Sequence, residues 1–279
     1  MSTEFKSHRQ GSVKQITSHS NPIVKEIKGL VAQRKHRRES GLFVAEGLKL
    51  ATDAMNAGWG VRYLAIGPEG RENKMALEAA AKAKARGALI LEVNNAILSA
   101  ITRRDNPQMV VGVYEQKTVP LSAVDPSHSK TWVCLDRVRD PGNLGTVIRT
   151  ADAVGASGII LIGETTDPFA VEAVRATMGS LFHMPLVRCT SDAFLKFRET
   201  WPGPVVGTHL RGTKDYRQVD YREPVLLMMG NEQSGLTDDL ADACTDLVKI
   251  PQEGQADSLN LAVATAVMLF EVRRNYLKL

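Results

Sequence analysis

Two polar side chains, Asn143 and Arg149, lie six residues apart where a predicted strand over 131–135 gives way to a predicted helix. A helix start carries unpaired N–H groups and partial positive charge, so it suits anions and the backbone of a ligand. A guanidinium group further along the helix adds a permanent cation. The pair therefore predicts a site for phosphates or for a polar cofactor.

A second segment places a carboxylate at the end of an apolar strand. The strand predicted over 225–229 ends abruptly at Gly230, and Glu232 follows. A continuous apolar strand is typical of a parallel sheet covered on both faces, and ligands bind at the carboxyl ends of such strands. Gly230 would let a ligand approach the backbone closely, so this segment predicts a second part of the same edge.

A third segment follows the strand predicted over 247–250 and leads through a loop into a predicted helix over 258–276. We expect Asp257 or Ser258 to cap this helix. Asn260 is a polar residue among small apolar ones. It is therefore a further candidate for a polar site at a helix start.

Each segment alone has a simpler interpretation. Arg149 would be an exposed helix arginine paired with an acid such as Asp152, Glu232 a solvated acid in a turn, and Asn260 a residue that satisfies a helix end. The order of the three segments along the chain favours a shared site over these separate interpretations. Asn-x-Gly-x-x-x-Arg, Gly-Asn-Glu-x-x-Gly-Leu and Ile-Pro-x-x-Gly-x-x-x-Ser-Leu-Asn each follow an apolar strand, and residues 131–279 thereby resemble the SpoU (TrmH-like) RNA ribose methyltransferases.

This resemblance implies an α/β catalytic domain with a parallel sheet whose C-terminal part forms a deep trefoil knot, and a homodimer through that domain. It implies methyl transfer from S-adenosyl-L-methionine to a ribose 2′-hydroxyl in structured RNA, with ribosomal RNA favoured and transfer RNA as the alternative. Gly230, Ile250 and Leu259 would hold the cofactor largely through their backbone, and Thr208 would line the same pocket. The catalytic residues that it implies are Arg149, Asn143, Glu232, Ser258 and Asn260.

The role of Arg149 follows from its chemistry. A ribose hydroxyl is a poor nucleophile until its proton is removed or strongly polarised. A guanidinium group stays charged at neutral pH, so it is an unsuitable general base. Our hypothesis is that Arg149 grips the target phosphate and stabilises negative charge developing on the 2′-oxygen, while Glu232 orients the ribose or Arg149.

Upstream of these motifs the positive charge is concentrated. From Lys6 to Arg38 there are nine Lys or Arg and a single acid, Glu26, although the whole chain carries only +4. Such a run favours nucleic-acid binding over a solvated helix face. Asn21-Pro22-x-Val24-Lys25 and Arg38-Glu-Ser-Gly-Leu-Phe-Val-Ala-Glu-Gly47 resemble the substrate-binding domain often joined to this catalytic domain, itself similar to some RNA-binding ribosomal proteins. The candidate RNA-binding residues are Arg34, Lys35, Arg37 and Arg38.

Helical and strand-like segments alternate, which predicts an α/β architecture. We expect a disordered tail at 1–11, an RNA substrate-binding domain at 12–115, a linker at 116–130 and the catalytic domain at 131–279. Helices are expected over 22–33, 47–57, 74–86, 95–101, 143–154, 171–178, 193–200 and 258–276. Strands are expected over 42–45, 61–66, 89–93, 109–114, 131–135, 158–162, 184–187, 204–208, 225–229 and 247–250.

Other features exclude several classes of protein. No apolar run is long enough to span a membrane, and the start of the chain lacks a signal-peptide core. The three cysteines are far apart without metal-ligand spacing, and the six histidines form no ligand cluster. We therefore expect a cytoplasmic protein with reduced thiols, no bound metal and no membrane partner.

Three alternatives stay open. A dinucleotide-dependent oxidoreductase would need a Gly-x-Gly-x-x-Gly turn, which Asp-Pro-Gly-Asn-Leu-Gly145 imitates only in part. A non-catalytic RNA-binding protein would not bind S-adenosyl-L-methionine. Methylation of a base would differ from ribose methylation in the product.

Overall fold

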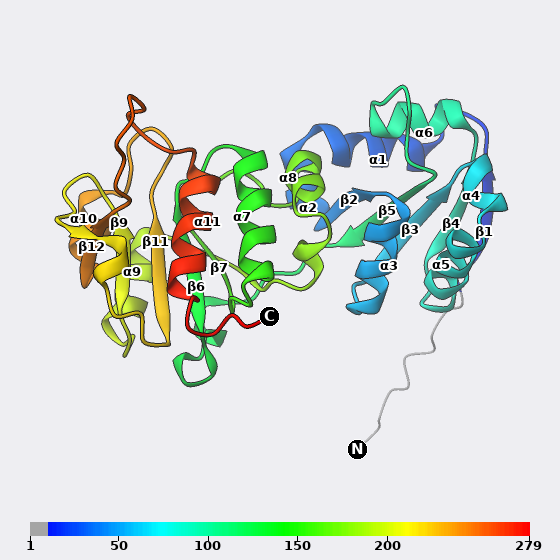
Figure 1. Ribbon diagram of the computed structural model, residues 1–279. Helices are drawn as coiled ribbons and strands as arrows, with labels where there is room; N and C mark the ends of the chain where they lie inside the picture. The colour runs from blue at the N-terminus through cyan, green and yellow to red at the C-terminus, as the bar shows by residue number, and fades with distance from the viewer. Residues whose placement is uncertain (1–10) are drawn as a thin grey trace, which may run out of the picture. The chain divides into compact units, whose positions relative to one another are not determined.

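The computed structural model describes residues 11–279, which divide into two compact units (Figure 1). The first comprises the chain up to Gln116 together with Phe169–Arg175, and the second comprises Lys117–Pro168 and Ala176–Leu279. Most of the expected disordered tail, residues 1–10, lies outside the described residues. Gly11 belongs to the fold, because its N–H donates to the Lys84 carbonyl at 3.0 Å.

The first unit is built on a mixed five-stranded sheet with the order β1-β4-β3-β5-β2. β1, β4 and β3 are parallel, whereas β5 is antiparallel to both β3 and β2. The strands are β1 (Val13–Ile16), β2 (Leu42–Glu46), β3 (Val61–Ile66), β4 (Leu89–Val93) and β5 (Val110–Glu115).

Helices cover both faces of this sheet. One apolar cluster joins the sheet to α1 (Pro22–Ala32) and α6 (Asn95–Thr102), and another joins it to α3 (Leu48–Asn56) and α5 (Lys74–Ala85). α1 forms where it does because Pro22 fits the first turn and the Asn21 side chain accepts from the Ile23 N–H at 3.0 Å. Two short helices, α2 (Arg34–Ser40) and α4 (Pro68–Glu72), complete the unit.

A distant segment completes the core of the first unit. The Phe169 ring is fully buried with its centroid 5.0 Å from that of Phe43, and Val171 joins the same core as α1. Arg175 Nη2 donates to the buried Glu46 carboxylate at 2.6 Å. α8 (Val171–Ala176), which we expected inside the catalytic domain, therefore packs almost entirely within the first unit.

The second unit contains a seven-stranded, fully parallel sheet with the order β10-β12-β9-β11-β6-β7-β8. Its strands are β6 (Thr131–Asp136), β7 (Gly158–Ile162), β8 (Leu186–Cys189), β9 (Val205–Thr208), β10 (Lys214–Asp215), β11 (Val225–Met229) and β12 (Asp246–Lys249). The expected α/β architecture with a parallel C-terminal sheet is confirmed. The order brings the ends of β12, β9, β11 and β6 next to one another.

Helices also cover both faces of the second sheet. α9 (Ser191–Glu199) and α10 (Asp238–Asp242) pack on the face that carries Cys134, Leu226 and Met228. α7 (Pro141–Ala153) and α11 (Leu261–Val272) lie side by side and contact β7 and β11. α11 is much shorter than the helix expected over 258–276.

The interpretation of 116–130 as a linker is wrong. Val119 pairs with Val187 of β8, with its N–H 2.8 Å from the Leu186 carbonyl, and Val124 is buried in the core of the second unit. Two 3₁₀ turns, Leu121–Ala123 and Pro126–His128, account for the absence of a strong period. The chain instead passes from the first unit to the second directly between Gln116 and Lys117, and it crosses between them again on either side of Phe169–Arg175.

No helix between residues 11 and 279 has the length and apolar character needed to cross a membrane. Within that same range, no group of three or more His, Cys, Asp or Glu is arranged to hold a metal ion.

Candidate functional site

The three motif segments meet at the side chain of Asn143. Asn143 Nδ2 donates to Glu232 Oε1 at 3.3 Å, and Asn143 Oδ1 accepts from Asn260 Nδ2 at 2.9 Å. These partners are 89 and 117 positions away in the sequence. The structure thus brings together three of the five residues expected to be catalytic.

Asn143 lies in the first turn of α7 rather than at its first residue. The helix begins at Pro141, and Asp140 is its N-cap, with Oδ1 accepting from the Asn143 N–H at 2.6 Å. Proline suits this place because it lacks an N–H that would go unpaired there. The earlier start leaves the Asn143 side chain free to bridge the other two segments.

The Glu232 carboxylate lies over the chain that leads into α7. Beside Asn143, it accepts from the Arg139 N–H at 3.3 Å and from the Asp140 N–H at 3.2 Å. A carboxylate near a helix start is favoured by the unpaired N–H groups and the helix dipole. Between described residues, no hydrogen bond or ion pair joins Glu232 to Arg149, and the side chain that Glu232 contacts is that of Asn143.

The turn that carries Glu232 is built around Gly230 and Asn231. A Cβ on Gly230 would lie 2.2 Å from the backbone of Gly235 and Leu236, so no larger residue fits. The buried Asn231 side chain accepts from Gln233 and Ser234 N–H groups at 2.9 and 3.2 Å. The turn's own close packing, rather than a ligand's approach, is sufficient reason for the glycine.

Asn260 is the N-cap of α11, and the expectation that Asp257 or Ser258 caps this helix is wrong. Asn260 Oδ1 accepts from the N–H groups of Ala262 and Val263 at 2.9 and 3.3 Å. The cap falls later because the helix begins only at Leu261, its first buried residue. One Asn260 side chain therefore ends the loop and contacts Asn143 at the same time.

The loop from Pro251 to Leu259 is exposed, and within the described chain its residues make no hydrogen bond or ion pair. Ser258, an expected catalytic residue, is among them. Exposed backbone N–H and C=O groups that have no partner within the protein are available to a ligand. Leu259 adds an apolar side chain that is 36% exposed.

Arg149 projects from α7 away from the core. The buried residues of the helix lie on its other sides, and Arg149 is exposed. It forms no ion pair with Asp152 or with any other described residue. Its guanidinium is thus a free cation on the helix that carries Asn143.

The residues expected to bind the cofactor lie at neighbouring strand ends. Thr208 closes β9, Gly230 follows β11 and Ile250 follows β12, and these three strands are adjacent in the sheet. Thr208 Oγ1 contacts Met229 Sδ at 3.6 Å. Backbone groups at strand ends, the unpaired loop and an exposed leucine suit a ligand that combines a polar amino-acid part with an aromatic base.

Arg37 is not a surface residue, contrary to our expectation for the basic run. Its side chain is 5% exposed, and Nη1 donates to the Leu30 and Val31 carbonyls at 2.7 and 3.4 Å. It satisfies the end of α1, where carbonyl groups lack helical partners. Arg34, Lys35 and Arg38 are exposed, although Lys35 lies 3.8 Å from Glu39.

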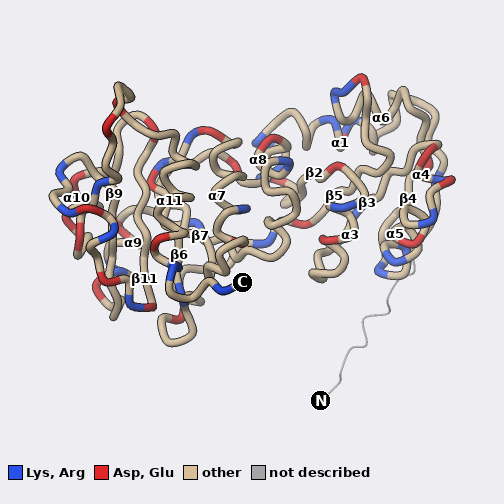
Figure 2. The backbone as a smooth tube through the Cα atoms, in the orientation of Figure 1, with Lys and Arg blue, Asp and Glu red and all other residues tan. Residues whose placement is uncertain are grey.

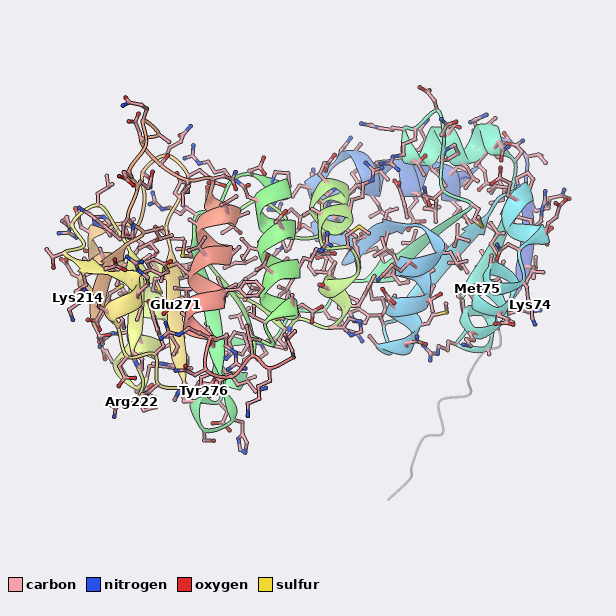
Figure 3. The ribbon with its side chains drawn as sticks, in the orientation of Figure 1. Lys74, Met75, Lys214, Arg222, Glu271 and Tyr276 are labelled. Atoms are coloured by element: carbon pink, nitrogen blue, oxygen red, sulfur yellow. The ribbon has the colours of Figure 1, made fainter. Side chains whose placement is uncertain are left out.

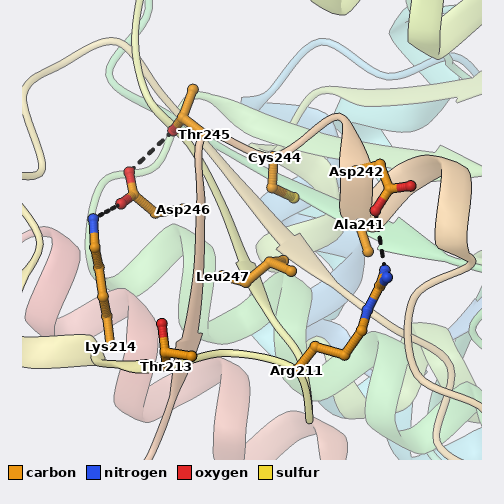
Figure 4. Close-up of a pocket in the computed structure, with 9 residues that line it drawn as sticks. All are labelled: Arg211, Thr213, Lys214, Ala241, Asp242, Cys244, Thr245, Asp246 and Leu247. Carbon is orange, nitrogen blue, oxygen red and sulfur yellow. Dashed lines mark hydrogen bonds and ion pairs between the residues drawn. The ribbon is translucent and has the colours of Figure 1, made fainter.

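A cavity of about 380 Å³ lies elsewhere in the second unit (Figure 4). Its wall includes Thr245 and Asp246, at the amino end of β12, whereas the motif loop follows the carboxyl end. Its charges are already paired, Lys214 with Asp246 and Arg211 with Asp242. Figure 2 shows the same mixing of acidic and basic residues around α10 and β12.

The cysteines are free, and none is a nucleophile in this site. Burial raises the pKa of Cys189 to about 11 and that of Cys244 to about 12, and it holds the pKa of Cys134 well above its ordinary value. All three are therefore protonated at neutral pH, which makes them poor nucleophiles.

The parallel sheet, with polar residues gathered at the ends of adjacent strands, defines an α/β protein of the class whose ligands bind at that edge of the sheet. The chain belongs to the SpoU rRNA methylase family, whose sequence model matches residues 130–270. Residues 21–112 match the MRM3-like substrate binding domain. Both findings confirm the family that the three motifs indicated.

Relatives share this organisation along nearly their whole length. The chain is 31% identical to the 23S rRNA (uridine(2479)-2′-O)-methyltransferase of Streptomyces viridochromogenes, over 95% of this chain and 94% of that protein. It is 32% identical to the 23S rRNA (guanosine(2553)-2′-O)-methyltransferase RlmP of Bacillus subtilis, over 94% of this chain and all of that protein. The crystal structure of an AdoMet-bound rRNA methyltransferase from Sinorhizobium meliloti is 55% identical with a TM-score of 0.89, covering 95% of this chain and 99% of that one.

Proposed function

We propose that the protein is an S-adenosyl-L-methionine-dependent RNA 2′-O-methyltransferase that acts on ribosomal RNA. The observation that carries the proposal is that Glu232 and Asn260 both contact Asn143, which lies on the same helix as the unpaired Arg149. The two relatives described above are named as 2′-O-methyltransferases of 23S rRNA. Transfer RNA is the alternative substrate.

Thr208, Gly230, Ile250 and Leu259 would hold the cofactor. When bound, it supplies an electrophilic methyl group on a sulfonium. The unpaired backbone of residues 251–259 offers donors and acceptors for the polar parts of such a ligand. The AdoMet-bound Sinorhizobium meliloti structure supports S-adenosyl-L-methionine as the cofactor.

Arg149 would act on the RNA. As a free cation it binds the target phosphate and stabilises negative charge on the 2′-oxygen as the hydroxyl loses its proton. Asn143, fixed between Glu232 and Asn260, would present its amide to the ribose, and Ser258 in the exposed loop would complete the contacts. The proposal therefore divides the site into an RNA side on α7 and a cofactor side on the loops.

The first unit would bind the RNA substrate through Arg34, Lys35 and Arg38. These exposed cations lie on α2, in a stretch with few acids, and phosphate neutralisation by such groups dominates RNA affinity. The match to a substrate binding domain supports this role.

A second copy of the chain would cover α11. Val263 and Phe270 on this helix are 51% and 54% exposed, although the helix is apolar on most sides. Such a helix is normally buried. We therefore propose a homodimer through the second unit, and the family also supports a deep trefoil knot there.

The test is methylation of ribosomal RNA with isotopically labelled S-adenosyl-L-methionine, followed by nuclease digestion and mass analysis. A labelled 2′-O-methylnucleoside is expected, with Arg149→Ala as the inactive control. A labelled base would instead establish base methylation, and the absence of both product and S-adenosyl-L-methionine binding would favour a non-catalytic RNA-binding protein. Mapping methylated nucleotides in total RNA with and without the gene would identify the position.

A further inference from the structure

We propose that Arg137, held by Asp136, is a positioning residue that sets the Glu232 carboxylate and through it Asn143. The inference rests on the proposed function of the site. Sequence reasoning missed both residues, although an acid directly at the end of a buried strand was a signal for them. Arg137 touches none of the expected catalytic side chains among the described residues, so any effect on catalysis must pass through others.

The backbone at Arg137 is unusual and is held on both sides. Its φ of +49° lies in the left-handed region, which residues with a side chain rarely adopt. Its N–H donates to the Ile162 carbonyl at 3.0 Å, and its carbonyl accepts from Asn231 Nδ2 at 2.7 Å. Strain of this kind persists only where the surroundings determine it, and it is concentrated at functional sites.

The Arg137 side chain joins the end of β6 to the turn that carries Glu232. Its Nε and Nη2 donate to the two Asp136 oxygens at 2.9 and 3.0 Å. Nη2 also lies 3.3 Å from the Gly235 carbonyl and 3.4 Å from Ser234 Oγ. This fork geometry is specific to arginine.

Asp136 fixes the far end of the same turn. It is fully buried, and its Oδ2 accepts from the Thr237 N–H at 3.1 Å, at the start of α10. The hydrogen bonds to the Asp136 carboxylate also raise the pKa of Arg137, so this guanidinium stays charged. The segment from Asn231 to Thr237 is therefore attached at both ends to the end of β6.

This attachment determines what Glu232 meets. Just beyond Arg137, the chain presents the Arg139 and Asp140 N–H groups to the Glu232 carboxylate. The left-handed turn at Arg137 directs these N–H groups, and the Arg137 side chain places the carboxylate opposite them. Removing either interaction would displace Glu232 and release Asn143.

The test compares Arg137→Ala, Arg137→Lys and Glu232→Gln with the double variant of Arg137→Ala and Glu232→Gln. Arg222→Ala, on the surface of the second unit, is the matched control (Figure 3). We expect Arg137→Ala to lower kcat by about 100-fold, the scale of a ~1 Å misplacement, with the RNA KM nearly unchanged. Arg137→Lys should recover part of kcat, because a lysine restores the charge pair without the fork.

The double variant discriminates most sharply. If Arg137 acts through Glu232, the losses in kcat of the two single variants do not multiply. The kcat of the double variant should then lie within about 3-fold of the kcat of the slower single variant. Multiplicative losses would overturn the proposal. So would a raised RNA KM with unchanged kcat, which is the result expected if Arg137 contacts the RNA itself.

A second measurement does not depend on activity. In amide NMR spectra, Arg137→Ala should shift the Arg139 and Asp140 N–H signals in the same direction as Glu232→Gln, whereas Arg222→Ala should leave them in place. Unshifted signals in a folded Arg137→Ala protein would overturn the positioning role. An inactive wild-type protein would refute the proposed function alone, because this spectral comparison would still decide the role of Arg137.

Discussion

Asn260 Nδ2 lies 2.9 Å from Asn143 Oδ1, although the two residues are 117 positions apart in the sequence. The same Asn260 side chain caps α11, and the same Asn143 side chain donates to Glu232. The start of α7, the start of α11 and the turn after β11 are thus joined by two asparagine side chains. An amide can do this because it donates and accepts at once.

The two tasks of Asn260 can be separated by substitution. Asn260→Ala should lower the free energy of unfolding by about 1 kcal/mol, because the α11 cap is removed. Asn260→Asp keeps an oxygen for the cap but no N–H for Asn143. It should therefore unfold like the wild type in thermal melts and still lose about 10-fold in kcat, the effect of a hydrogen bond worth about 1.4 kcal/mol. Wild-type turnover in Asn260→Asp would show that the link to Asn143 is dispensable.

Arg149 should matter for turnover and not for folding. Its exposed, unpaired side chain predicts that Arg149→Ala changes the free energy of unfolding by less than about 0.5 kcal/mol. Turnover should be abolished, and the affinity for S-adenosyl-L-methionine measured by calorimetry should equal that of the wild type. Arg149→Lys should retain measurable activity; equal loss in both variants would contradict a simple charge role.

The exposed cations of α2 should contribute salt-dependent RNA affinity. Replacing Arg34, Lys35 and Arg38 by Ala should weaken RNA binding and flatten its dependence on salt. The slope of log K against log salt should fall by about 0.7–0.9 for each RNA phosphate that the variant no longer neutralises. The binding constant measured at several salt concentrations checks this.

A control of equal charge is available on α5, which covers the other face of the first sheet. Replacing three lysines of α5 removes the same charge, and it should leave the salt slope close to that of the wild type. The chosen residues, of which Lys74 is labelled in Figure 3, are Lys74, Lys82 and Lys84. An equal change in both triple variants would mean that net charge, not the α2 surface, governs affinity.

The buried carboxylate of Glu46 should stabilise the first unit. Glu46→Gln removes the charge that Arg175 meets at 2.6 Å and should cost about 2 kcal/mol, below the ~3–5 kcal/mol of a fully buried pair because the Arg175 side chain is 31% exposed. The first transition in thermal unfolding should move to lower temperature. Lys49→Ala, which breaks an exposed pair with Asp53, should move it little. Equal shifts would contradict a special role for the buried pair.

Sequence patterns predicted the inner strands and left peripheral elements unseen. Four strands have the predicted bounds, because each is a largely apolar run that ends at glycine, proline or a polar residue. They cover residues 61–66, 89–93, 158–162 and 225–229. β1 was missed because only Ile16 of its four residues is buried, and α2 because its sequence is almost wholly polar. Neither segment has a regular spacing of apolar residues from which a helix or strand could be predicted.

In the site, residue types were predictable and partners were not. The motifs identified Asn143, Glu232 and Asn260, but only the fold shows that Asn143 bridges the other two. Arg37 was misjudged because it looks identical to its exposed neighbours in a basic run, and its burial depends on where α1 ends. Long-range contacts of this kind leave no local pattern.

The insertion of Phe169–Arg175 into the first unit bears on how this architecture could be inherited. A gene fragment that stops at Gln116 would encode a core without the ring that packs on Phe43 and without the partner of Glu46. The first unit is therefore not a module that can be exchanged by a single cut and join. A transplant of the first unit would have to carry residues 169–175 together with the chain up to Gln116.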